Sequence, residues 1–128
     1  MRYKLLGRSG LRVSELGLGT MTFGEEWGWG ASDTESRKIF DAYAGAGGNF
    51  IDTANRYTNG TSERLVGEFV ASDRDHFVVA TKYTLFDREG EPNGAGNHKR
   101  TWCGPWRAAS GAWVWTTWTC FGSTHGTS

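Results

Sequence analysis

The chain has 128 residues, enough for one ordinary domain, and its apolar content suffices for a modest core. Its 14 basic and 14 acidic side chains balance, with no basic block or acidic tail, which argues against nucleic acid or an anionic membrane as a partner. Small molecules or other proteins are the partners we expect. The N-terminus lacks a signal-peptide pattern and no segment is apolar enough to cross a bilayer, so we expect a cytoplasmic protein. Cys103 and Cys120 are too far apart for a metal or redox pair, and we expect free thiols and no metal.

The first predicted element is a hairpin. Apolar runs at 3–6 and 11–13 flank glycines at turn positions 7 and 10. A buried strand is predicted at 16–20. Ser32 and Glu35 then fit a capping box, in which each side chain satisfies a free backbone donor at a helix start.

The helix that begins there should run to about Ala46 before two glycines end it. Its buried stripe is predicted from apolar residues at 3–4 spacing: Ile39, Ala42, Tyr43 and Ala46. A second strand is predicted at 49–53, a second helix at 62–70 and a third strand at 77–82. The inward residues of the second helix should be Leu65, Val66 and Phe69.

The order is strand, helix, strand, helix, strand. The second and third strands are nearly continuous apolar runs, which is typical of a parallel sheet covered on both faces. This pattern predicts an α/β fold and leaves two architectures, a (β/α)₈ TIM barrel or a doubly wound sheet. A complete barrel needs at least about 200 residues, so the chain could hold only part of one.

Three residues near strand ends could form an active site. Asp52 ends the second strand, Tyr57 follows in its loop, and Lys82 ends the third strand, so neighbouring parallel strands would bring them together. A lysine next to a tyrosine stabilises the phenolate, and a carboxylate keeps that lysine charged, which suits proton delivery to a carbonyl under reduction. Spacing alone also allows a turn-capping Asp52, a packing Tyr57 and a solvated Lys82.

A longer string favours the chemical interpretation. Residues 48–57, GNFIDTANRY, followed by Ser62-Glu63, closely resemble the aldo-keto reductase signature G-x-N-x-I-D-T-A-x-x-Y…S-E. The resemblance extends over residues 1–100, through YKLLGRSGL at 3–11, LGLGTMTFG at 16–24, ATK at 80–82 and NGAGNH at 93–98. It implies a TIM barrel capped by an N-terminal hairpin, here truncated to the hairpin and about three βα units.

The resemblance also implies an activity, the reduction of aldehydes and ketones to alcohols with NADPH. Tyr57 would be the general acid, Lys82 would favour its ionisation, and Asp52 would pair with Lys82. The nicotinamide ribose would lie beside three residues of the first strand end, Gly19, Thr20 and Met21, together with Asp52. Trp27 or Trp29 would line a substrate pocket, although ordinary loop packing explains these tryptophans as well. The adenosine-phosphate site of the family would be missing.

The composition changes near residue 100. Residues 101–128 contain no acidic residue, a single Lys or Arg (Arg107), and five of the seven tryptophans. The segment 112–121 is uncharged, β-prone and free of proline, which suits aggregation better than an evolved surface. An aromatic platform for sugars or single-stranded bases usually interleaves several basic residues, whereas this tail has only Arg107.

Codon arithmetic predicts a frameshifted tail. When the third base of each codon is joined to the first two bases of the next, residues 101–114 can be read as N-M-V-R-A-V-E-G-S-L-G-R-L-G, an amphipathic helix. The following codons permit V-D-Y-V-D-L-F-W-V-H-A-W-D, which resembles the family's next strand and includes its catalytic histidine. That histidine codon would span Ser123 and Thr124, so His125 is a coincidence of frame.

Two hypotheses follow. The first is an aldo-keto reductase chain whose 1–100 part is native and whose 101–128 part is a non-native, disordered or aggregation-prone tail, leaving it inactive. The second is a non-enzymatic binding module with an aromatic tail. Three strands alone would leave two open sheet edges, so we expect a chain of marginal stability.

Overall fold

The computed structural model describes residues 1–82, 85 and 90–96. A two-stranded antiparallel hairpin, β1 (Tyr3–Leu5) and β2 (Arg12–Ser14), precedes a parallel three-stranded sheet in the order β3-β4-β5. The strands of that sheet are short: Leu18–Gly19, Phe50–Asp52 and Val78–Ala80. Between them lie α1 (Asp33–Gly45) and α2 (Thr61–Val70), with 3₁₀ turns at Tyr57–Gly60 (η1) and Ala71–Asp73 (η2). The predicted hairpin and element order are confirmed.

The hairpin forms at the predicted glycines. Gly7 and Gly10 have φ values of +57° and +79°, a region that favours residues without a side chain. The Leu6 amide donates to the Leu11 carbonyl at 2.9 Å and closes the turn. The second strand lies one residue later than predicted.

The first helix begins as predicted but buries a different face. The Ser32 side chain accepts a hydrogen bond from the Glu35 amide at 3.3 Å, as in half of a capping box. The predicted stripe is wrong, because Ile39 is 44% exposed whereas Phe40 is buried. Phe40 lies at 5.4 Å from Phe69 and 5.2 Å from Phe77, centroid to centroid. Packing these three rings rotates the helix by about one residue from the predicted orientation.

Of the four residues in the predicted stripe, only Tyr43 lies partly inside; Ala42 and Ala46 are exposed together with Ile39. The buried side of α1 is instead formed by Ser36 and Phe40, with Tyr43 and Ala44 at its margin. A set of 3–4 spacings defines a helical face but does not say which of two overlapping faces a sheet will cover.

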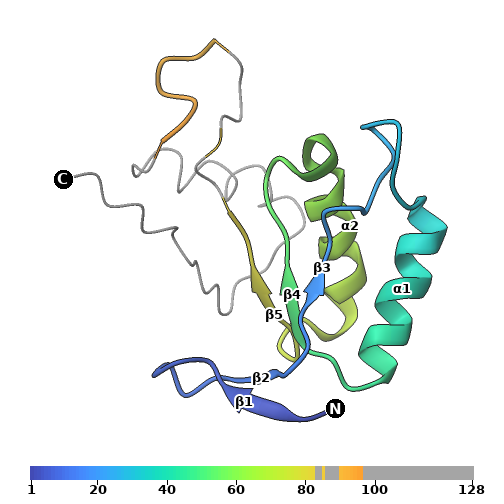
Figure 1. The fold of residues 1–128 in the computed structure, drawn as a ribbon, viewed down its shortest axis with the longest axis vertical. Helices are drawn as coiled ribbons and strands as arrows, with labels where there is room; N and C mark the ends of the chain where they lie inside the picture. Colours follow the sequence, from blue (N-terminus) through green and yellow to red (C-terminus); the bar gives the residue numbers. More distant parts are fainter. Residues whose placement is uncertain (83–84, 86–89, 97–128) are drawn as a thin grey trace.

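Both helices lie on the same side of the sheet (Figure 1). Leu65, Val66 and Phe69 of α2 are buried, as predicted, and pack on the strands. Ile51 and Val79, the central residues of β4 and β5, have no exposed surface. Phe50 and Val78 on the opposite face are only half-buried. The sequence predicted burial of both faces of the sheet, but only the face under the helices is completely buried.

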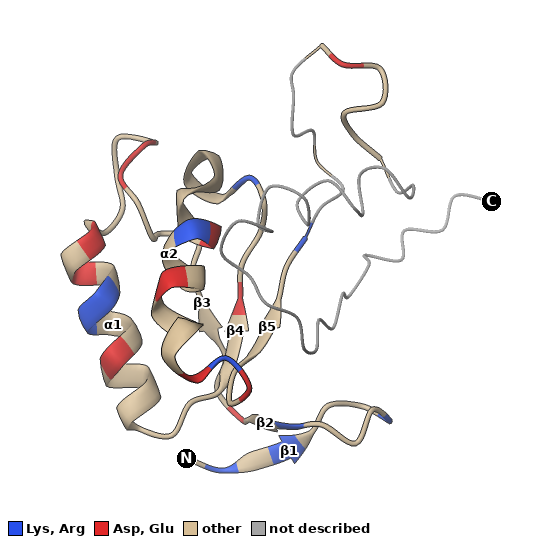
Figure 2. Cartoon of the chain, turned by 180° about the vertical axis from the view of Figure 1, so that it is seen from behind, with Lys and Arg blue, Asp and Glu red and all other residues tan. Residues whose placement is uncertain are grey.

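Charges of both signs are distributed along the two helices (Figure 2). Arg37 pairs with Asp41 on α1, and Arg64 pairs with Glu68 on α2, at 2.9 and 2.8 Å. Each pair is exposed and contributes at most a few tenths of a kcal/mol, about 0.3–0.5. Among the described residues, no helix has the length and apolar character needed to cross a membrane.

Candidate active site

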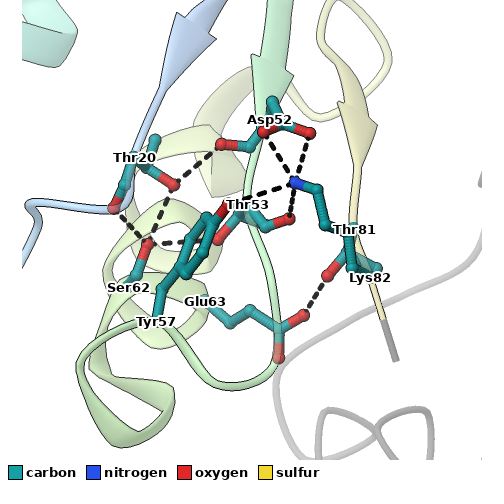
Figure 3. A network of polar contacts seen from close by, with 8 residues as sticks. All are labelled: Thr20, Asp52, Thr53, Tyr57, Ser62, Glu63, Thr81 and Lys82. Carbon is teal, nitrogen blue, oxygen red and sulfur yellow. Dashed lines mark hydrogen bonds and ion pairs between the residues drawn. The ribbon is translucent and has the colours of Figure 1, made fainter. Parts of the chain in front are cut away.

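The three predicted catalytic residues meet at the carboxyl ends of the parallel strands (Figure 3). Asp52 is the last residue of β4, and its Cα pairs with that of Ala80 in β5. Lys82 lies two residues beyond Ala80, and Tyr57 begins η1. The parallel register therefore places all three side chains at one edge of the sheet, as the sequence predicted.

Lys82 makes the central contacts. Its Nζ lies 2.7 Å from each carboxylate oxygen of Asp52, 3.1 Å from the Thr53 carbonyl oxygen and 3.3 Å from Tyr57 Oη. An ammonium has three N–H donors, which matches these three partner residues. The alternative interpretation of Lys82 as a solvated strand end does not describe this geometry.

Two opposing effects act on the pKa of Lys82. Partial burial lowers it, but hydrogen bonds and charge interactions with Asp52 and Tyr57 outweigh the burial, so the net pKa is raised above 10.5. Lys82 is therefore a cation throughout the physiological pH range. Its side chain is still 49% exposed, so solvent screens the pair and its stabilising effect is small.

The backbone after Tyr57 is unusual. Thr58 and Asn59 adopt left-handed conformations with φ of +47° and +56°, and Thr58 is β-branched and fully buried. The Thr58 hydroxyl donates to the Phe23 carbonyl and accepts from the Ser62 amide at 3.1 Å. Such strain persists only where surrounding contacts enforce it, and here it turns the chain directly beside Tyr57. Only Asn59-Gly60, a turn dipeptide, signals this feature in the sequence.

The predicted cofactor-contacting residues lie at the end of β3. Gly19 pairs with Asp52 in the sheet register and is exposed, and no atom lies within 4 Å of where its Cβ would be. Met21 is also exposed, whereas Thr20 is fully buried. The Thr20 amide and hydroxyl both donate to the Asp52 carbonyl, at 3.0 and 3.1 Å. Its side chain therefore faces the protein, not an open site.

Trp27 and Trp29 lie in the loop between β3 and α1, with ring centroids 5.7 Å apart. They are 38% and 51% exposed. The loop is held by a Phe23↔Ala31 bridge and by Gly30, where a Cβ would lie 2.0 Å from the Gly24 carbonyl oxygen. The tryptophans are thus presented on a well-packed loop, with no described contact to Tyr57 or Lys82.

The site also contains buried hydroxyls to which the sequence analysis assigned no role. Thr53, Thr58 and Thr81 are buried, as is Ser62 in α2. The signal in the sequence that could have pointed to them is the threonine that directly follows each parallel strand. Within the described residues no cluster of three or more His, Cys, Asp or Glu side chains could hold a metal. The predictions for residues 101–128, which concern Arg107, both cysteines, the aromatic tail and His125, lie outside the described residues.

Comparison with known proteins places this geometry in a family. The sequence profile of the Aldo/keto reductase family matches residues 15–107, more than half of the chain. Aldo-keto reductase ausK of Emericella nidulans is 46% identical over 112 residues, which is 78% of this chain and 28% of that protein. Aryl-alcohol dehydrogenase [NADP(+)] of Phanerodontia chrysosporium is 49% identical over 87 residues, 63% of this chain and 23% of that protein.

A solved structure agrees. The aldo-keto reductase AKR11C1 from Bacillus halodurans, in its holo form, matches with a TM-score of 0.61 and 35% identity, over 72% of this chain and 29% of that one. The chain therefore belongs to the aldo/keto reductase family, and its described sheet and helices are part of a TIM-barrel fold. It spans about a quarter of the length of the relatives described above.

Proposed function

We propose that this chain carries the proton-transfer part of an NADPH-dependent carbonyl reductase active site. The single observation that supports the proposal best is the position of Lys82 Nζ, within hydrogen-bonding distance of both Asp52 and Tyr57 Oη. A hydrated, isolated lysine would serve no proton transfer. A lysine cation fixed between a carboxylate and a phenol oxygen can stabilise the negative charge that develops on that oxygen as its proton passes to a substrate.

Tyr57 acts as the general acid in this proposal. As a carbonyl carbon gains hydride, its oxygen becomes an alkoxide, and the Tyr57 hydroxyl donates the proton that completes the alcohol. Lys82 then stabilises the resulting phenolate, and Asp52 keeps Lys82 cationic. Tyr57 is half-buried, so solvent can return the proton.

The end of β3 fits a nicotinamide cofactor. NADPH supplies the hydride when bound. Gly19 presents an open surface beside Asp52, and Met21 is exposed next to it, so both can line the cofactor's ribose. Thr20 contributes through its buried hydrogen bonds to the Asp52 carbonyl, which hold the strand end in place. The name of the Phanerodontia relative supports NADP as the cofactor and an aromatic alcohol or aldehyde as the substrate to assay first. A cytoplasmic location stays a prediction from the sequence.

We also propose that residues 101–128 are read in a shifted frame. The codons permit a shifted reading as an amphipathic helix and a strand with the family histidine, whereas the chain as read has neither pattern. A site without that histidine lacks one of its groups, so we expect no turnover from this polypeptide. Resequencing the gene across codons 90–130 tests this: a missing base near codon 100 is expected, and a verified unshifted frame would contradict it.

Kinetics of the frame-restored gene product test the proposed chemistry. We expect it to oxidise NADPH, followed at 340 nm, with a substituted benzaldehyde. Tyr57→Phe keeps the ring but removes the acid, so kcat should fall by roughly 10²–10⁴-fold. Lys4→Met, at an exposed hairpin position, is the control and should leave kcat unchanged. A Tyr57→Phe enzyme with full kcat would reject Tyr57 as the acid.

A further inference from the structure

One buried threonine directly follows each strand of the parallel sheet. Thr20 follows β3, Thr53 follows β4 and Thr81 follows β5, and their exposures are 0%, 1% and 6%. Side chains alternate between the faces of a strand, so Thr53 points away from the face that carries Asp52, and Thr81 away from the face of Lys82. The three threonines therefore face the helix layer, behind the ion pair.

The first turn of α2 contacts all three of these threonines (Figure 3). Ser62 Oγ lies 2.7 Å from the Thr20 carbonyl oxygen, 2.8 Å from Thr20 Oγ1 and 3.1 Å from Thr53 Oγ1. The neighbouring residue, Glu63, accepts a hydrogen bond from the Thr81 hydroxyl. Adjacent residues of one helix thus bind the ends of three strands.

The hydroxyl protons of this group can be assigned without conflict. Thr20 Oγ1 donates to the Asp52 carbonyl, Ser62 Oγ donates to the Thr20 carbonyl, and Thr53 Oγ1 donates to Ser62 Oγ. Each hydroxyl donates once and finds a partner, as buried hydroxyls require. The set is therefore a complete network and not a chance cluster.

Ser62 is not needed to cap its own helix. The N-cap of α2 is Gly60, which makes no side-chain capping bond. The Ser62 amide is already satisfied by Thr58 Oγ1 at 3.1 Å. The Ser62 hydroxyl instead binds the ends of the strands, so its role is to hold those strand ends and not to cap the start of α2.

The network reaches the ion pair through the backbone. Thr53 lies between Ser62 and Lys82: its hydroxyl contacts Ser62, and its carbonyl accepts from Lys82 Nζ at 3.1 Å. Thr81 directly precedes Lys82 in the chain, and its hydroxyl donates a hydrogen bond to Glu63. The Thr53 amide donates to the Ala80 carbonyl at 2.9 Å and ties the two strand ends together.

We propose that Ser62 and Glu63 are positioning residues that hold Asp52 and Lys82 in register with Tyr57 by binding the threonines behind them. This inference rests on the proposed function, because it assigns a role within that same site. It explains why the Ser-Glu pair stands at the start of α2, where it reaches three strand ends at once.

The ionisation of Lys82 in the complete 128-residue chain tests the proposal. The chain has four lysines, so ¹³Cε resonances can be assigned and titrated, with Lys38 on α1 as an internal reference. Thr81→Val removes the hydroxyl and keeps the shape, and should lower the Lys82 midpoint towards the ordinary lysine value. Thr81→Ser restores the hydroxyl and should restore the midpoint.

A merely structural role predicts a different result. Thr81→Val would then lower the melting temperature while the Lys82 midpoint stayed at its original value, and this outcome overturns the proposal. If Thr81→Val fails to fold, Glu63→Ala replaces it, since Glu63 is only partly buried. An unchanged Lys82 midpoint in Glu63→Ala overturns the proposal equally. The titration needs neither cofactor nor turnover, so failure of carbonyl reduction would reject the proposed function alone.

Discussion

Gly48 precedes β4 and lies against the ring of Tyr43 on α1. A Cβ at position 48 would lie 2.3–2.5 Å from three atoms of that ring. Gly48 does not have a positive φ, so alanine is compatible with its backbone. Gly48→Ala therefore tests the side-chain contact alone.

The Tyr43 ring is poorly able to move away. Its hydroxyl lies 2.7 Å from Ser14 Oγ, 2.8 Å from the Leu16 carbonyl, and 2.7 and 3.0 Å from the carbonyl and amide of Phe50. A shift of about 1 Å, needed to reach ordinary contact, would break several of these bonds. Overpacking costs about 1–3 kcal/mol and each lost hydrogen bond about 1 kcal/mol, so we expect Gly48→Ala to destabilise the fold by roughly 2–5 kcal/mol.

Urea unfolding followed by circular dichroism measures the effect. Gly45→Ala is the matched control, because it lies in α1 with open space around its Cβ and should stabilise the chain by about 0.5–1 kcal/mol. In a Tyr43→Ala background the penalty of Gly48→Ala should disappear. Equal effects of Gly48→Ala and Gly45→Ala, or a penalty that persists without the ring, would refute the steric explanation.

Three further results are expected. Asn49→Ala leaves the buried Ser14 amide without its 2.7 Å acceptor, which should cost about 1–3 kcal/mol and speed hydrogen exchange at Ser14; unchanged protection there would contradict it. Because the pKa of Lys82 is raised, its stabilising effect should be complete below about pH 10.4, the ordinary lysine value, and be lost as the pH rises through the folded pKa. Asp52→Asn removes the carboxylate that pairs with Lys82 and should weaken that dependence in urea titrations across pH 9–12. Finally, β3 and β5 are the outer strands of the sheet within the described residues, which predicts a broad, weakly cooperative melt, and a sharp two-state transition in the monomer would show that the described sheet is stable alone.

Local sequence was sufficient to predict most elements and to propose which residues meet at one edge of the sheet. The hairpin, both helices and all three parallel strands follow from glycines, a capping serine and apolar periodicity within a few residues. Convergence of strand ends in a parallel sheet made Asp52, Tyr57 and Lys82 candidates. Spacing alone left non-catalytic roles open for them, and the resemblance of residues 48–57 to the family signature favoured the catalytic roles. Comparison with the family then distinguished a barrel from a doubly wound sheet, which the strand order alone did not do.

Tertiary packing decided the features that depend on residues distant in the chain. Phe40 sets the face of α1 that is buried, because it packs against Phe69 of α2 and Phe77, the residue directly before β5. No local sequence pattern contains these contacts. The left-handed Thr58 and the buried role of Thr20 likewise depend on partners 35 and 32 residues away. A short stretch of sequence shows the periodicity of its side chains, but the environment of each side chain is set by the elements that pack against it. The threonine network behind Lys82 can therefore be seen only in the tertiary structure.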